Sequence, residues 1–96
     1  MSDTPLPPEA SLQIQLDDEV ANGHYVNMVL VSQTETEFTL DFVHVQPQQP
    51  RARVRTRVIL NPKHAKGLLL ALQTGVSAYE SRFGPLVLPQ DGRSMN

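Results

Sequence analysis

The chain has no cysteine and no tryptophan, and aromatic residues make up only 5% of its 96 residues. Without cysteine it can form neither disulfides nor a reactive thiolate. No apolar run approaches the roughly 18 to 20 residues that a membrane-spanning helix needs. No glycine-rich loop of the phosphate-binding kind is present, and the first residues, 1–5, lack the basic start and apolar core of a secretory signal. These absences predict a soluble cytoplasmic protein.

The charge is balanced, with a formal net value of -2 at neutral pH. Such a chain has no general attraction to nucleic acid or anionic lipid, so any binding of that kind must come from a local cluster of basic residues. The length corresponds to one domain, and a domain this small has a thin stability margin that a partner subunit would widen.

The hydrophobic pattern predicts an α+β fold, a four-stranded antiparallel meander followed by one long C-terminal helix packed on one sheet face. We expect strands over residues 12–16, 25–32, 38–43 and 52–60. Residues 1–10 are predicted to be a disordered arm, residues 11–84 the single domain, and residues 85–96 a flexible tail.

The proline-containing segment 46–50 cannot continue a strand, so it predicts a hairpin loop between the last two strands. If Val45 faces Arg51 across this loop, Asp41 lies opposite Arg55 on a wet face. The other face then holds the apolar side chains, because burying an unpaired arginine there would cost several kcal/mol. These apolar side chains are Phe38, Leu40, Phe42, Val54 and Val58.

Helix signals bracket residues 62–83. Asn61 is a good N-cap, Pro62 suits the first helical position, and Gly84 followed by proline ends the helix. Apolar residues recur at helical spacing and predict a stripe that covers the sheet. The stripe comprises Ala65, Leu68, Leu69, Leu72, Val76, Tyr79 and Phe83.

Small residues form a second line along the same helix, and two of them are glycines that each cost about 1 kcal/mol relative to alanine. Close approach of another backbone would compensate this cost, either the sheet of the same chain or a helix across a two-fold axis. The strand at 25–32 is apolar on both faces, so it is either central or covered by another subunit. The predicted dimer contact therefore comprises Tyr25, Val29, Val31, Gly67, Ala71, Gly75 and Ala78.

No residue pattern indicates catalysis, a cofactor or a metal. The three histidines, His24, His44 and His64, lack the spacing of a zinc site. The acidic residues group at strand ends, where solvated turns are their commonest role. An enzyme that uses His44 or His64 in a dimer cleft is a further interpretation, for which the residues indicate no reaction.

Arginines alternate along the segment from Arg51 to Arg57, and they are the most distinctive polar feature. Regular alternation places Arg53, Arg55 and Arg57 on one strand face. They form a candidate surface for a polyanion or a partner protein, which Lys63 and Lys66 extend at the helix start. The favoured alternative is a solvated strand face that discourages edge-to-edge aggregation.

Four segments of the chain resemble a family of short bacterial proteins catalogued as a domain of unknown function, number thirty-four sixty-seven. The segments are 19–27, 37–42, 57–66 and 79–84, and the resemblance covers about residues 12–84. The resemblance implies a prokaryotic cytosolic protein with no assigned enzymatic activity and supplies no functional residues. Gly67 and Gly75 depart from the longer residues expected in that pattern. The order of strands and helix is also similar in topology to the SecB-type export chaperones.

The leading hypothesis is a non-enzymatic protein-interaction module, an adaptor, small chaperone or inhibitor of a partner protein, acting as a homodimer. The alternative from another class is a nucleic-acid-binding regulator that uses the arginine-rich strand. In that case, affinity should fall steeply with salt.

Overall fold

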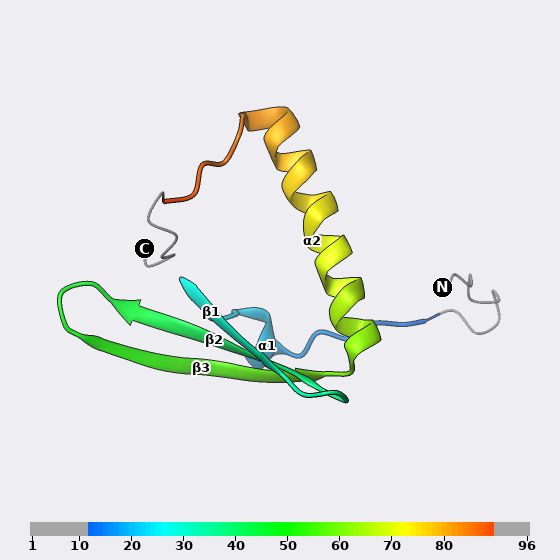
Figure 1. Ribbon diagram of the computed structural model, residues 1–96, viewed down its shortest axis with the longest axis horizontal. Helices are drawn as coiled ribbons and strands as arrows, with labels where there is room; N and C mark the ends of the chain where they lie inside the picture. The colour runs from blue at the N-terminus through cyan, green and yellow to red at the C-terminus, as the bar shows by residue number, and fades with distance from the viewer. Residues whose placement is uncertain (1–11, 90–96) are drawn as a thin grey trace.

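The computed structural model describes residues 12–89, which form a three-stranded antiparallel sheet followed by one long helix. The strands β1 (Met28–Gln33), β2 (Phe38–Gln46) and β3 (Arg51–Leu60) form a meander in the order β1-β2-β3 (Figure 1). The C-terminal helix α2 (Pro62–Phe83) follows β3 after a single residue. The α+β class and the strand-to-helix order are confirmed. The predicted arm at 1–10 and most of the tail at 85–96 lie outside the described residues.

The predicted strand at residues 12–16 is wrong, so the described sheet has three strands and not four. These residues are irregular and lead into the four-residue helix α1 (Asp18–Ala21). Leu12, Ile14 and Leu16 expose 69%, 86% and 65% of their surface. Alternating apolar residues form a strand only where a neighbouring strand completes the backbone hydrogen bonds, and none of the described strands pairs with this segment.

The strand predicted at 25–32 begins three residues later, at Met28, and Asn27 just before it makes side-chain hydrogen bonds to β2. Its Nδ2 donates to the carbonyl of Val45 at 3.1 Å, and its Oδ1 accepts from the Val45 N–H at 2.8 Å. The Asn27 side chain thus binds the backbone of β2 at Val45, next to the end of the strand.

The hairpin between β2 and β3 exists, but its predicted register is wrong. Arg51 pairs with Gln46 and not with Val45, and a bulge then leaves Arg55 without a direct partner. Beyond the bulge Asp41 pairs with Arg57. The prediction assumed a regular ladder, whereas one extra residue in a strand shifts every later pair.

Helix α2 has the predicted bounds, and its ends show why. The Asn61 Oδ1 accepts a hydrogen bond from the His64 N–H at 2.8 Å, and Pro62 occupies the first turn. Gly84 adopts a φ of +99°, which favours glycine, and its N–H donates to the carbonyl of Glu80. These local contacts fix the helix independently of any packing.

The packing of α2 on the sheet is not found. The helix has no buried residue, and it projects away from the sheet at the end of β3 (Figure 1). Among the described residues only Leu40 and Val43, both on β2, are buried apolar side chains. The single connecting residue, Asn61, has the extended backbone that is usual for an N-cap. No helix in the described part is long and apolar enough to cross a membrane.

Candidate functional site

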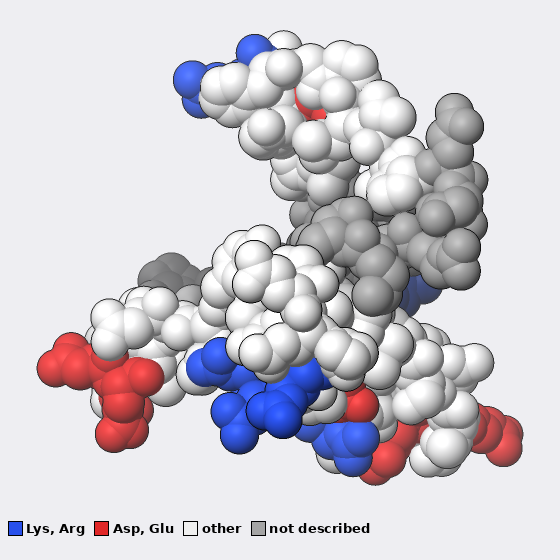
Figure 2. Space-filling model, turned by 90° about the vertical axis from the view of Figure 1, so that its left-hand side faces the viewer, with Lys and Arg blue, Asp and Glu red and all other residues white. Residues whose placement is uncertain are grey.

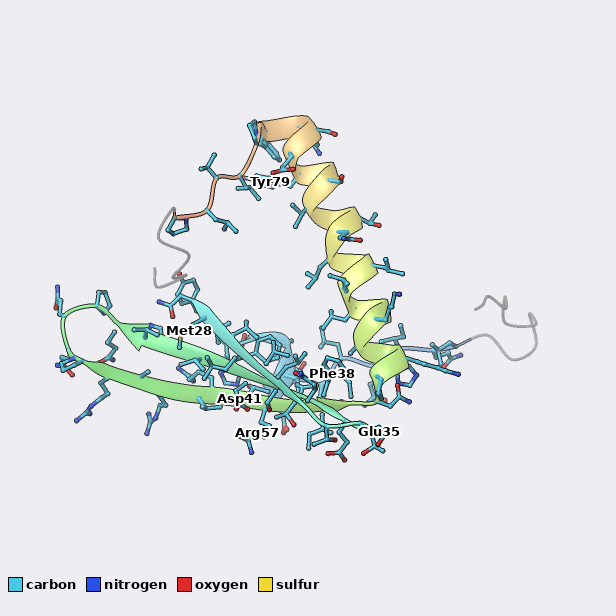
Figure 3. All side chains as sticks on the ribbon, viewed as in Figure 1. Met28, Glu35, Phe38, Asp41, Arg57 and Tyr79 are labelled. Atoms are coloured by element: carbon cyan, nitrogen blue, oxygen red, sulfur yellow. The ribbon has the colours of Figure 1, made fainter. Side chains whose placement is uncertain are left out.

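The apolar stripe of α2 is not covered by the other described residues. Leu69, Leu72 and Phe83 expose 52%, 57% and 65% of their surface. Tyr79 stacks at a tilt on Phe83, with ring centroids 4.9 Å apart, and lies near the end of α2 farthest from the sheet (Figure 3). An open hollow of about 550 Å³ follows the middle of this stripe. Its lining consists of Leu69, Leu72, Gln73, Val76, Ser77 and Glu80.

The chain after α2 is tied back to the helix beside this hollow. The N–H of Leu86 donates to the Glu80 Oε2 at 2.8 Å. Leu86, Val87 and Leu88 still expose 51%, 85% and 76% of their surface. This arm therefore adds apolar surface near the end of α2 and leaves the stripe open.

Within residues 12–89, nothing packs against the two glycines in the line of small residues on α2. A Cβ added to Gly67 or Gly75 would meet nothing within 4 Å. Helix-on-sheet packing therefore does not account for these glycines. A contact that includes Gly67, Ala71, Gly75 and Ala78 stays a prediction.

Strand β1 carries a second uncovered apolar surface. Val29, Leu30 and Val31 expose 46%, 50% and 56% of their surface, although they alternate between the two faces of the sheet. Tyr25, 74% exposed, contacts the His44 ring edge to face at 5.9 Å. The predicted dimer residues Val29 and Val31 on β1, and Tyr25 before it, are therefore accessible.

The arginines of β3 fall into two groups because of the bulge. Directly paired residues share a sheet face, so Arg53 lies with His44 while Arg57 lies with Asp41. His44 and Asp41 are three residues apart on β2 and hence on opposite faces. The predicted single row of three is therefore interrupted.

The first group, Arg51, Arg53 and Arg55, borders a hollow of about 380 Å³ near the hairpin. The Arg55 Nη2 also lies 3.0 Å from the His24 Nδ1. None of the lining residues is acidic. Figure 2 shows Lys and Arg side chains gathered in the lower part of that view. The lining comprises His44, Gln46, Arg51, Ala52, Arg53 and Arg55.

The second group is the ion pair of Arg57 with Asp41, on the side of the sheet that faces away from α2 (Figure 3). The Arg57 Nε and Nη2 donate to the two carboxylate oxygens of Asp41 at 2.7 Å and 2.9 Å. These hydrogen bonds lower the pKa of Asp41 and raise the pKa of Arg57. Asp41 thus neutralises one arginine of the predicted surface.

The remaining predicted residues do not join a common site. Lys63 and Lys66 belong to the first turns of α2 and do not line the arginine hollow. His24 and His44 contact Arg55 and Tyr25 respectively. Within residues 12–89, no group of three acidic or histidine side chains is placed to hold a metal ion.

The chain belongs to the family described as Protein of unknown function (DUF3467), which it matches over residues 1–88. This confirms the resemblance found in the sequence. No curated protein and no solved structure matches the chain.

Proposed function

We propose that this member of a family of unknown function is a non-enzymatic protein-interaction module that acts as a homodimer in the cytoplasm. Its role would be that of an adaptor, a small chaperone or an inhibitor of a partner protein. The observation that carries the proposal is the uncovered apolar surface. Helix α2 has no buried residue, although its stripe contains Leu69, Leu72 and Phe83.

The core of the described residues is small. Burial of a large apolar side chain contributes roughly 1.5 to 3 kcal/mol, and only two such side chains are buried among the described residues. Ordering one residue costs about 1 to 2 kcal/mol of backbone entropy. A 22-residue helix without a buried residue therefore gains little stability from the other described residues. Contacts with other polypeptides supply the burial that the single chain lacks.

Two surfaces are available for such contacts, and they suit different tasks. Strand β1 offers backbone hydrogen bonds as well as apolar side chains, while α2 offers an apolar stripe beside a line of small residues. Small residues allow the backbone of a bound segment to approach the helix closely. We assign the homodimer contact to the sheet and the partner-protein contact to α2.

Light scattering on the purified full chain at micromolar concentration tests the homodimer. The expected mass is twice 10.7 kDa, or 21.4 kDa. Dilution should shift the measured mass toward that of the monomer. Monomer and dimer should be the only two species in the series. A mass of 10.7 kDa throughout the concentration series, with a cooperative unfolding transition, contradicts the proposal.

A nucleic-acid-binding regulator is the second candidate. The observation that favours it is the hollow bordered by Arg51, Arg53 and Arg55, whose lining includes no acidic residue. Phosphate groups of a nucleic-acid backbone are the natural partners of such a cluster. The lining includes no Phe, Tyr or Trp, so the cluster suits phosphates better than unstacked bases.

A further inference from the structure

Strand β1 is the outer strand of the described sheet, and it lacks the features that usually protect such an edge. Exposed edges are commonly guarded by charged side chains, by proline, by bulges or by shortness. The six residues of β1, Met-Val-Leu-Val-Ser-Gln, include neither charge nor proline. The opposite edge, β3, contains four arginines and a bulge. The two edges of one sheet therefore differ in whether they can accept another strand.

The side chains of β1 support the same conclusion. Val29, Leu30 and Val31 are each about half exposed, and they lie on both faces of the strand. A further strand beside β1 would cover all three at once, because cross-strand neighbours lie within contact distance on each face. An uncharged, apolar, extended segment is the complementary occupant.

We propose that β1 pairs antiparallel with β1 of a second copy, across a two-fold axis perpendicular to the sheet at Leu30. This inference rests on the proposed homodimer and specifies its interface. The axis keeps each sheet face continuous, so paired residues must come from the same face. Leu30 then lies opposite Leu30 of the partner subunit, and Val29 lies opposite the partner subunit's Val31. An axis at Val31 would instead place Leu30 opposite the partner subunit's Ser32.

A second copy is favoured as the occupant because self-pairing closes the assembly. A two-fold contact uses the same strand of both subunits and leaves neither β1 edge free. The resulting six-stranded sheet ends on β3 at both sides. The arginines of β3 repel one another there, which opposes further growth by edge addition. The proposal thus explains why one edge is uncharged while the other carries four arginines.

Single cysteines provide the direct test, because the natural chain contains none. In an antiparallel pair, directly opposed Cα atoms lie about 4.5 to 5.5 Å apart, within the range that a disulfide spans. Oxidation of Leu30→Cys should therefore link two copies at 21.4 kDa, twice the chain mass. Ser32→Cys is the matched control on the same strand and face. Its two copies would lie about 14 Å apart, too far for a disulfide.

The outcomes separate this inference from the homodimer itself. Light scattering on the reduced variants establishes the mass, and circular dichroism establishes that α2 is retained. A dimer that is cross-linked through Leu30→Cys and not through Ser32→Cys supports the proposal. A dimer cross-linked by neither variant overturns it and leaves the homodimer standing, whether β1 is covered by residues 1–11, by another protein or by nothing. A monomeric protein overturns both.

Charge substitutions give a second measurement that does not need oxidation. In the proposed register, Val29→Lys with Val31→Glu places opposite charges across the axis, whereas Val29→Lys with Val31→Lys places like charges there. The dimer dissociation constant of the second variant should exceed that of the first by about tenfold or more. Equal dissociation constants overturn the register at Leu30.

Discussion

Arg55 and Arg57 are two residues apart on β3, yet their guanidinium groups have different surroundings. Arg57 is held by both carboxylate oxygens of Asp41, whereas Arg55 contacts the His24 ring and borders the hollow near the hairpin. The bulge at Arg55 produces this difference. The positive charge available to an anion therefore resides with Arg51, Arg53 and Arg55, while that of Arg57 is neutralised.

The nucleic-acid candidate makes a prediction at this scale. Replacing Arg53 and Arg55 with glutamine should weaken binding of duplex DNA or RNA and lower the slope of log affinity against log salt by about 2. Arg57→Gln is the matched control and should change the slope less. A titration series over salt concentration measures both. Undetectable binding by the natural chain at low salt rejects this candidate, and equal losses for all three arginines reject the hollow as the site.

The pairing of Asp41 could be predicted from the sequence only in part. The apolar alternation of residues 38–42 requires that Asp41 and its partner share the face opposite Phe38 and Leu40, and this is what the structure shows. Which arginine is the partner depends on the turn and the bulge. Neither can be predicted from the alternation of side chains. Arginines alternate regularly from residue 51 to residue 57 in the sequence, although Arg55 is bulged in the structure.

At the scale of elements, α2 shows what local sequence determines. Asn61, Pro62 and Gly84 act on backbone groups within one or two turns, so the helix bounds follow from the sequence alone. The amphipathic stripe indicates that one face should be covered, but periodicity does not identify what covers it. The expected cover was the sheet of the same chain, and the structure leaves the stripe open.

The glycines of α2 yield a prediction for this element. A Cβ at Gly75 meets no atom within 4 Å, so Gly75→Ala should stabilise the free protein by about 0.5 to 1 kcal/mol through helix propensity. Urea unfolding at a fixed protein concentration measures the change. Ala71→Gly, on the same line, is the reverse control and should destabilise by a similar amount. A loss of stability in Gly75→Ala, together with dissociation of the dimer, would place the two-fold contact at α2.

The described part of the molecule is open, because its apolar side chains are not gathered into one core. The described residues bury only Leu40 and Val43, both on the central strand, while large apolar side chains of β1 and α2 stay accessible. The sequence predicted enough apolar surface for a core, with strands and a helix of suitable length. It could not predict that the two halves of that surface would remain apart, since contacts between chains and contacts within a chain require the same side chains.

If the sheet continues through β1 into a second copy, the backbone amides of β1 are buried only in the dimer. Hydrogen exchange of the β1 amides, followed over a dilution series, measures this burial. Every second amide of Met28–Gln33 points toward the outer edge. We expect these amides to be protected at high concentration and to exchange rapidly once dilution separates the subunits, while α2 amides keep a constant rate. Protection of β1 that does not change with concentration, or a change confined to α2, would show that the subunits do not pair through β1.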